Sequence, residues 1–220
     1  MASLVYIVDD DLSYRIAIGR LLRAAGYDVA EYASASQLMA SPPDGATASC
    51  IVLDVRMPGV SGPELQDRLG ELGSAVPIVF LTGHGDIPIT VRAMRAGAED
   101  FLTKPVSAPT LLAAIQRAVA RHQSRLDQQN RLKAERARLD QLTPREREVF
   151  GLVIRGRMNK QIAYELGMSE RTVKAHRQRV MEKLQARSLA ELVSMAERLG
   201  GLAESAHVEM TPDAQDQTGR

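Results

Sequence analysis

Three consecutive aspartates, Asp9–Asp11, come directly after the apolar run LVYIV. Other polar side chains end or follow apolar runs in the same way, namely Asp54, Thr82 and Lys104. Carboxylates that are placed together repel one another unless a cation lies among them, and their oxygens suit a hard ion such as Mg²⁺ or Mn²⁺. Phosphoryl transfer needs chiefly such an ion, a lysine, a hydroxyl donor and in-line positioning. These residue types therefore indicate a phosphoryl-transfer site in which an aspartate nucleophile forms an acyl phosphate.

The elements that would position these residues alternate along the first 120 residues. Five mainly apolar runs are typical of strands, most of them buried on both faces: 4–8, 28–32, 50–55, 76–81 and 100–103. Helical segments separate or follow them: 13–25, 35–40, 62–72, 87–96 and one that begins near 109. This alternation predicts an α/β fold with a doubly wound, five-stranded parallel sheet. Because ligands bind outside the carboxyl ends of such strands, we expect the polar residues to meet at that edge.

A long helix is predicted to follow the sheet, because residues 110–143 contain no glycine or proline. Apolar residues recur in it at irregular spacings among arginine, glutamine and glutamate. His122 and Gln129 fall where the seam of a coiled coil would have leucine. Pairing with a second copy and a solvated spacer helix therefore both remain open.

Four short helices are predicted beyond the long one, which indicates a small all-α domain. Thr143 and Ser188 each stand three residues before a glutamate, the pattern of a capping box. The other expected helix boundaries are Gly156, Asn159 as an N-cap, Gly167 and Ser169 as an N-cap. Residues 204–220 show no periodicity, and we expect them to be disordered.

Residues 159–184 are predicted to form a helix, a glycine turn and a second helix, the pattern of a helix-turn-helix motif. On the second helix one stripe is apolar apart from a histidine that we expect to be structural: Val173, His176, Val180 and Leu184. The opposite stripe is basic and polar and would face base edges in a major groove: Arg171, Lys174, Ala175 and Gln178. Lys160 and Arg179 are better placed for phosphates.

Charge is distributed unevenly. Residues 1–120 carry 9 Lys/Arg against 13 Asp/Glu, whereas residues 143–200 carry 12 against 7. This asymmetry favours one acidic unit and one unit that seeks nucleic acid, although charge alone fits differently solvated faces equally well. No apolar run is long enough to span a membrane, no secretory leader is recognisable, and Cys50 is the single cysteine. We therefore expect a cytoplasmic protein without a disulfide framework.

The segments YIVDDD, VLDVRMPGVSG, VFLTGHGD and FLTKP resemble the receiver domain of two-component response regulators, a flavodoxin-like fold, over residues 1–120. The resemblance implies that Asp54 is the phosphoacceptor. It also implies a Mg²⁺ or Mn²⁺ site formed by Asp10 directly, by Asp9 through a water, by Asp54 and by the backbone carbonyl of Arg56.

The same resemblance implies a switch around the phosphoryl group. Thr82 and Lys104 would bind its oxygens, Lys104 and Pro105 would be joined by a cis peptide, and the rotamer of Phe101 would report the active state. Asp11 fits the acidic third position of the motif but receives no assigned contact.

The segment from LTPREREVFG to VMEKL resembles the LuxR-type helix-turn-helix domain, over residues 142–203. Together with a helical linker at 121–141, the two domains resemble response regulators of the NarL/FixJ class. The resemblance implies a sensor histidine kinase as phosphodonor, homodimerisation on phosphorylation, and binding of double-stranded DNA with inverted repeats. It also implies contact with RNA polymerase, more often as an activator than as a repressor, and no membrane partner.

Two other uses of the fold fit the sequence less well. A nucleotide-binding relative of flavodoxin has a cradle of backbone N–H groups after its first strand, where DDDLS would repel an anion. A phosphatase with an aspartate nucleophile commonly has a second aspartate two residues later, where this chain has Arg56. The main competing hypothesis is a receiver-like module that is gated by a partner without phosphorylation, and the presence of all five site residues argues against it. An RNA-binding helical domain is a third option.

Overall fold

The computed structural model of the chain describes residues 3–83 and 87–200, which form two compact units that divide between Gln128 and Gln129. The expected disordered tail, 204–220, lies outside the described residues. Among the helices of the described ranges, none combines the length and the apolar character that a membrane span requires.

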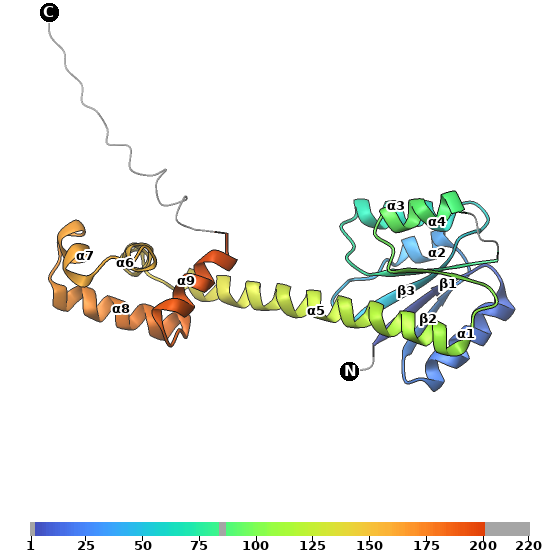
Figure 1. The fold of residues 1–220 in the computed structure, drawn as a ribbon, viewed down its shortest axis with the longest axis horizontal. Coiled ribbons are helices and arrows are strands. Elements are labelled where there is room, and N and C mark those ends of the chain that lie inside the picture. Colours follow the sequence, from blue (N-terminus) through green and yellow to red (C-terminus); the bar gives the residue numbers. More distant parts are fainter. Residues whose placement is uncertain (1–2, 84–86, 201–220) are drawn as a thin grey trace, which may run out of the picture. The chain divides into compact units, whose positions relative to one another are not determined.

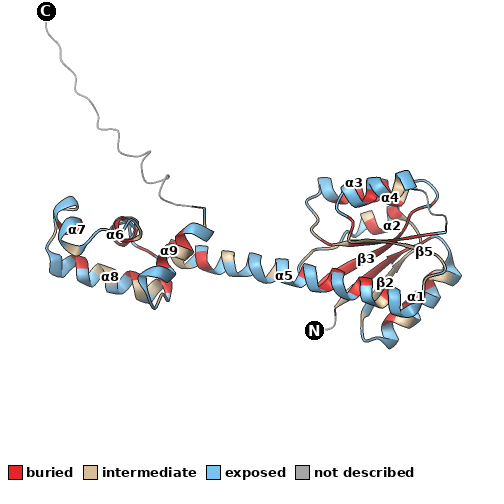
Figure 2. Ribbon diagram, viewed as in Figure 1, coloured by how far each residue is buried: buried red, intermediate tan, exposed pale blue. Residues whose placement is uncertain are grey.

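The first unit contains a five-stranded parallel sheet, which confirms the predicted fold class (Figure 1). The strand order is β2-β1-β3-β4-β5. The strands are β1 (Leu4–Val8), β2 (Asp28–Tyr32), β3 (Ser49–Asp54), β4 (Ile78–Thr82) and β5 (Asp100–Thr103). The predicted bounds hold to within two residues, and Thr82 ends β4, as expected. Strands β3 (Figure 2) and β4 are buried along their whole length, as their continuous apolar sequences predicted.

Helices cover both faces of the sheet (Figure 1). On one face lie α1 (Leu12–Ala24) and the first part of α5 (Ala108–Asp140). On the other face lie α2 (Ala35–Ala40), α3 (Gly62–Glu71) and α4 (Ile87–Arg95). Each face has its own apolar core, so the sheet is held from both sides and its carboxyl edge is left for polar residues.

Helix α5 confirms the predicted long helix, but His122 has a role that the heptad pattern did not indicate. Its side chain is only 1% exposed, and its Nδ1 accepts a hydrogen bond from the backbone N–H of Ser49 at 3.0 Å. Burial is the largest cause that lowers the pKa of His122. His122 thus fastens α5 to the start of β3 within the first unit and is not free to form a coiled-coil seam.

The second unit is the predicted all-α domain. Its helices are α6 (Pro144–Ile154), α7 (Asn159–Glu165), α8 (Glu170–Leu184) and α9 (Leu189–Arg198). The side chains packed between them include Val149, Phe150, Ile162, Val173 and Leu192.

Two of the four capping predictions are confirmed, one is wrong and one holds in part. Thr143 forms a capping box, and Ser169 caps α8. The N-cap of α7 is Met158 and not Asn159, because the Gln161 side chain accepts the N–H of Met158 and the helix begins one residue earlier. Ser188 accepts the N–H of Glu191, but the Glu191 carboxylate accepts the N–H of Arg187, so no box closes.

A partly buried ion pair connects α6 with α8. The Glu146 carboxylate is 2% exposed; it accepts the N–H of Thr143 at 2.9 Å and lies 2.6 Å from Nζ of Lys183. The hydrogen bond from Lys183, together with that from Thr143, lowers the pKa of Glu146 to about 2. Because this pKa is below its ordinary value of 4.5, the carboxylate stabilises the folded unit above pH 4.5, and the stabilisation is lost as the pH falls towards 2.

We predict that Glu146→Gln lowers the free energy of unfolding of the second unit by about 1–3 kcal/mol at pH 7, because Lys183 loses its charged partner. The difference from wild type should shrink at pH 3.5. Hydrogen exchange of peptides from 144–184, corrected for the intrinsic rate at each pH, measures it. The matched control is Glu148→Gln on the same helix, whose pair with Arg145 is exposed. Equal effects of the two changes at pH 7 would contradict this role of Glu146.

Candidate phosphoryl-transfer and DNA-binding sites

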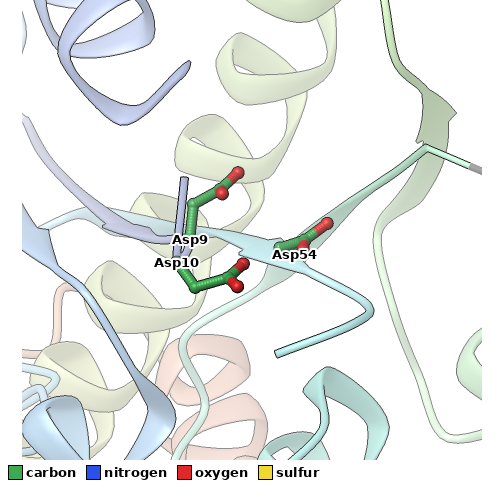
Figure 3. A group of neighbouring side chains, drawn as sticks. All are labelled: Asp9, Asp10 and Asp54. Carbon is green, nitrogen blue, oxygen red and sulfur yellow. The ribbon is translucent and has the colours of Figure 1, made fainter. Parts of the chain in front are cut away.

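Three carboxylates come together at the carboxyl edge of the sheet, as predicted. Asp9 and Asp10 follow β1 and Asp54 ends β3, and these two strands are hydrogen-bonded neighbours. One oxygen from each residue lies within 4.8 Å of the others. Asp10 points towards Asp54, and Asp9 lies beside them (Figure 3). Asp9 and Asp54 are buried, whereas Asp10 is exposed to solvent.

Lys104 enters the cluster from the loop after β5. Its Nζ lies 2.6 Å from Oδ2 of Asp9 and 3.1 Å from Oδ1 of Asp54. The ammonium also lies 4.4 Å from the ring centroid of Tyr14, and its backbone N–H donates to the carbonyl of Thr82 at 2.6 Å. The peptide between Lys104 and Pro105 is cis, which confirms that expectation. The lysine thus contacts two of the three carboxylates.

The electrostatics of the cluster leave an excess of negative charge. Burial raises the pKa of Asp54; the charge and hydrogen bond of Lys104 oppose this, and the nearby Asp9 adds to it. Burial tends to lower the pKa of Lys104, but its contacts with Asp9 and Asp54 prevail and the net direction is upward. Lys104 therefore stays cationic and offsets one of three negative charges. A divalent cation would balance the remaining two.

The partners of the aspartates separate their roles. In Asp9, Oδ1 accepts the N–H of Asp11 at 2.9 Å and Oδ2 is held by Lys104. Among the described residues, the Asp10 carboxylate has no hydrogen-bond or ion-pair partner. A set of hard oxygen ligands with one free carboxylate fits Mg²⁺ or Mn²⁺. Asp10 and Arg56 also line one surface groove beside the cluster.

Asp11 has a structural role that the motif did not assign. Its carboxylate accepts the backbone N–H groups of Ser13 and Tyr14 and so caps the N-terminus of α1. An aspartate before a helical run is a recognised N-cap signal, so the pattern was available in the sequence. The third aspartate therefore does not join the cation cluster.

Thr82 and Phe101 lie on neighbouring strands, β4 and β5. Thr82 is buried at the end of β4, on the edge that carries the carboxylates. Phe101 is half-buried, and its ring centroid lies 5.8 Å from that of Phe80. Phe101 thus packs against the sheet core and does not contact the acidic cluster through any described interaction.

Gly62 is a further residue that the site requires. It begins α3, and a Cβ at this position would overlap with the carbonyl oxygen of Asp54 and lie 3.0 Å from Cε1 of Phe80. The helix can approach the end of β3 this closely only because residue 62 has no side chain. The signal was the glycine of VSG, whose tight packing cannot be recognised from the sequence alone.

In the second unit, α8 presents the predicted polar stripe to solvent. All of its four members are exposed: Arg171, Lys174, Ala175 and Gln178. Val173, Val180 and Leu184 on the opposite stripe are buried, and His176 is half-buried beside them. The two faces of α8 are therefore as the 100° periodicity predicted.

The basic residues around α8 include one that the sequence reasoning missed. Lys160 on α7 and Arg179 on α8 are exposed, as expected for phosphate contacts. Lys160 and Lys174 line a groove that also contains the half-buried Arg177. The guanidinium of Arg177 donates to the carbonyl of Arg157 at 3.5 Å. Arg177 was missed because its position lies between the two stripes of the helix.

Comparison with known proteins agrees with this geometry. A model of the response regulator receiver domain matches residues 5–116, and a model of the luxR family of bacterial regulatory proteins matches residues 140–196. The chain is similar to nodulation protein W of Bradyrhizobium diazoefficiens, with 46% identity over 95% of this chain and 91% of that protein. It is also similar to the transcriptional regulatory protein FixJ of the same species, with 41% identity over 90% and 96%.

A solved structure gives the same result. The chain matches the response regulator StyR with a TM-score of 0.83 and 45% identity, covering 90% of this chain and 100% of that one. Two family models that together match most of the chain, and full-length relatives above 40% identity, establish the family. The chain belongs to the two-component response regulators of the NarL/FixJ class, with a receiver domain followed by a LuxR-type helix-turn-helix domain.

Proposed function

We propose that this response regulator is controlled by transfer of a phosphoryl group from a sensor histidine kinase to Asp54, and that the phosphorylated form binds promoter DNA. The observation that carries the proposal is the meeting of Asp9, Asp10, Asp54 and Lys104 at one sheet edge. These groups come from three separate segments of the chain and supply the acidic and cationic parts of a phosphoryl-transfer site.

In the proposed reaction, an oxygen of Asp54 attacks the phosphorus of the kinase phosphohistidine. The bond between phosphorus and the histidine nitrogen breaks, and an acyl phosphate forms on Asp54. Mg²⁺ or Mn²⁺, when bound, would neutralise charge on the transferred oxygens. Asp10, Asp54 and the Arg56 carbonyl would hold this ion, with Asp9 acting through a water. Lys104 stands within 3.1 Å of Asp54 and would pair with a phosphoryl oxygen.

The added charge would operate the switch. A phosphoryl group adds about −1.5 to −2 charges at neutral pH. Lys104 would exchange part of its contact with the carboxylates for the phosphoryl oxygens, and Thr82 would bind one of them. Phe101 would then repack against the core. A shift of the receiver from 1:99 to 99:1 in favour of its active state needs about 5.5 kcal/mol of differential interaction free energy. The new charge contacts of the phosphoryl group would supply much of this energy.

The output would be a homodimer on DNA. Helix α4 exposes Ile87, Val91 and Met94, an apolar surface next to β5 that suits pairing of two receivers. We assign the receiver to 1–120, the linker to 121–141, the DNA-binding domain to 142–203 and a disordered tail to 204–220. Two α8 helices would read the half-sites of an inverted repeat, about one helical turn apart. We further propose that the protein is a cytoplasmic transcription activator and that it contacts RNA polymerase.

We predict that acetyl phosphate with Mg²⁺ adds the mass of one phosphoryl group to the wild-type chain and none to Asp54→Asn, because Asp54 is the proposed nucleophile, whereas both carboxylate oxygens of Asp9 are already held by hydrogen bonds. Intact-protein mass spectrometry measures this. Asp28→Asn, at the exposed start of β2, is the control and should be modified like wild type. A wild-type chain that stays unmodified would favour gating by a partner without phosphorylation.

We predict that Lys174→Ala costs about 1–3 kcal/mol on a preferred inverted repeat and relaxes base preference, because Lys174 faces the base edges. Lys160→Ala should weaken binding to all duplexes similarly and lower its salt dependence, because Lys160 faces phosphates. Fluorescence anisotropy with specific and scrambled DNA at several salt concentrations measures both. Identical effects of the two changes would contradict the face assignment, and equal affinity for duplex RNA would instead favour an RNA-binding domain.

A further inference from the structure

A buried cation contacts the backbone of the acidic cluster. Arg15, in the first turn of α1, has only 8% of its surface exposed. Its guanidinium donates a hydrogen bond to the backbone carbonyl of Asp9 at 2.5 Å. Within residues 3–83 and 87–200, no carboxylate forms an ion pair with Arg15. Burial of a guanidinium without a carboxylate partner costs free energy unless its hydrogen bonds compensate for the lost hydration.

The hydrogen bond from Arg15 fixes one peptide group of the site. The N–H of Asp9 donates to the carbonyl of Tyr32 at 3.2 Å, so the backbone of Asp9 is held on both sides. The carbonyl that Arg15 binds belongs to the peptide between Asp9 and Asp10. Since a peptide is planar, holding its oxygen also fixes the position of the Asp10 nitrogen and the start of the Asp10 side chain.

Asp10 depends on this support more than its neighbours do. The carboxylate of Asp9 is held by Asp11 and Lys104, and that of Asp54 by Lys104. The Asp10 carboxylate has no such partner among the described residues, yet it points towards Asp54 (Figure 3). Its direction therefore follows from its backbone, and Arg15 contacts the peptide group that sets this backbone.

We infer that Arg15 is a positioning residue for the divalent-cation site, because it holds the Asp9–Asp10 peptide so that the Asp10 carboxylate faces Asp54. The inference rests on the proposed function, which assigns Asp10 as a direct ligand. Two effects of Arg15 on cation affinity have opposite signs. Its positive charge repels a cation, whereas its hydrogen bond orients a ligand for one. Loss of the side chain therefore shows which effect prevails.

The test is calorimetric titration of Mg²⁺ into the full chain. Arg15→Met removes the charge and the hydrogen bond, and we expect it to weaken Mg²⁺ binding by at least about 10-fold, as loss of a group that orients a metal ligand does. Arg15→Lys keeps the charge and a donor, and should recover part of the affinity. Arg20→Met removes an exposed arginine of the same helix and should match wild type. Unchanged or tighter binding by Arg15→Met would overturn the inference.

Thermal melting followed by circular dichroism separates positioning from loss of the fold. If Arg15→Met does not melt cooperatively, Arg15→Lys carries the test: weaker binding with wild-type melting supports the inference, and wild-type binding refutes it. If the wild-type chain itself binds no Mg²⁺, the proposed function fails and this inference fails with it. If the wild-type chain binds Mg²⁺ and both Arg15 variants bind it with wild-type affinity, only the inference about Arg15 fails.

Discussion

The repulsion among three carboxylates at one edge of the sheet is the constraint on which the site depends. Asp9, Asp10 and Asp54 place oxygens within 4.8 Å of one another, and Asp9 and Asp54 are largely removed from water. Lys104 compensates part of this charge. A bound divalent cation would compensate the rest, so the repulsion that destabilises the isolated cluster would favour binding of such an ion.

The fold brings these charges together through its topology. In a parallel sheet the carboxyl ends of neighbouring strands share an edge, so residues that follow β1, β3 and β5 meet although they are far apart in sequence. The two apolar cores on either face stabilise the sheet that fixes this edge. The close approach of α3 at Gly62 fixes the loop after β3, and the N-cap of α1 by Asp11 fixes the loop after β1.

Much of the fold could be predicted from the sequence, as could the residues that form the acidic cluster. The spacing of apolar residues and the position of a residue at the end of a strand are local signals. Strand β1 and helix α2 have the predicted bounds. What was missed depends on tertiary contacts. His122 was placed on a coiled-coil pattern because its hydrogen bond to Ser49 spans 73 residues. The hydrogen bond from Arg15 goes to a backbone carbonyl, which any residue type could supply, so the sequence gives no signal for it. The N-cap of α7 is Met158 instead of Asn159 because the Gln161 side chain accepts the N–H of Met158.

The central claim is that the acidic cluster binds a divalent ion and thereby lets Asp54 take up a phosphoryl-like group. Fluorine NMR of the full chain, titrated with beryllofluoride in the presence and absence of Mg²⁺, tests it most directly. We expect resonances of a bound beryllofluoride adduct only when Mg²⁺ is present, and none with Asp54→Asn. The absence of an adduct in the wild-type chain at saturating Mg²⁺, or an adduct that forms equally well without the ion, would contradict the account.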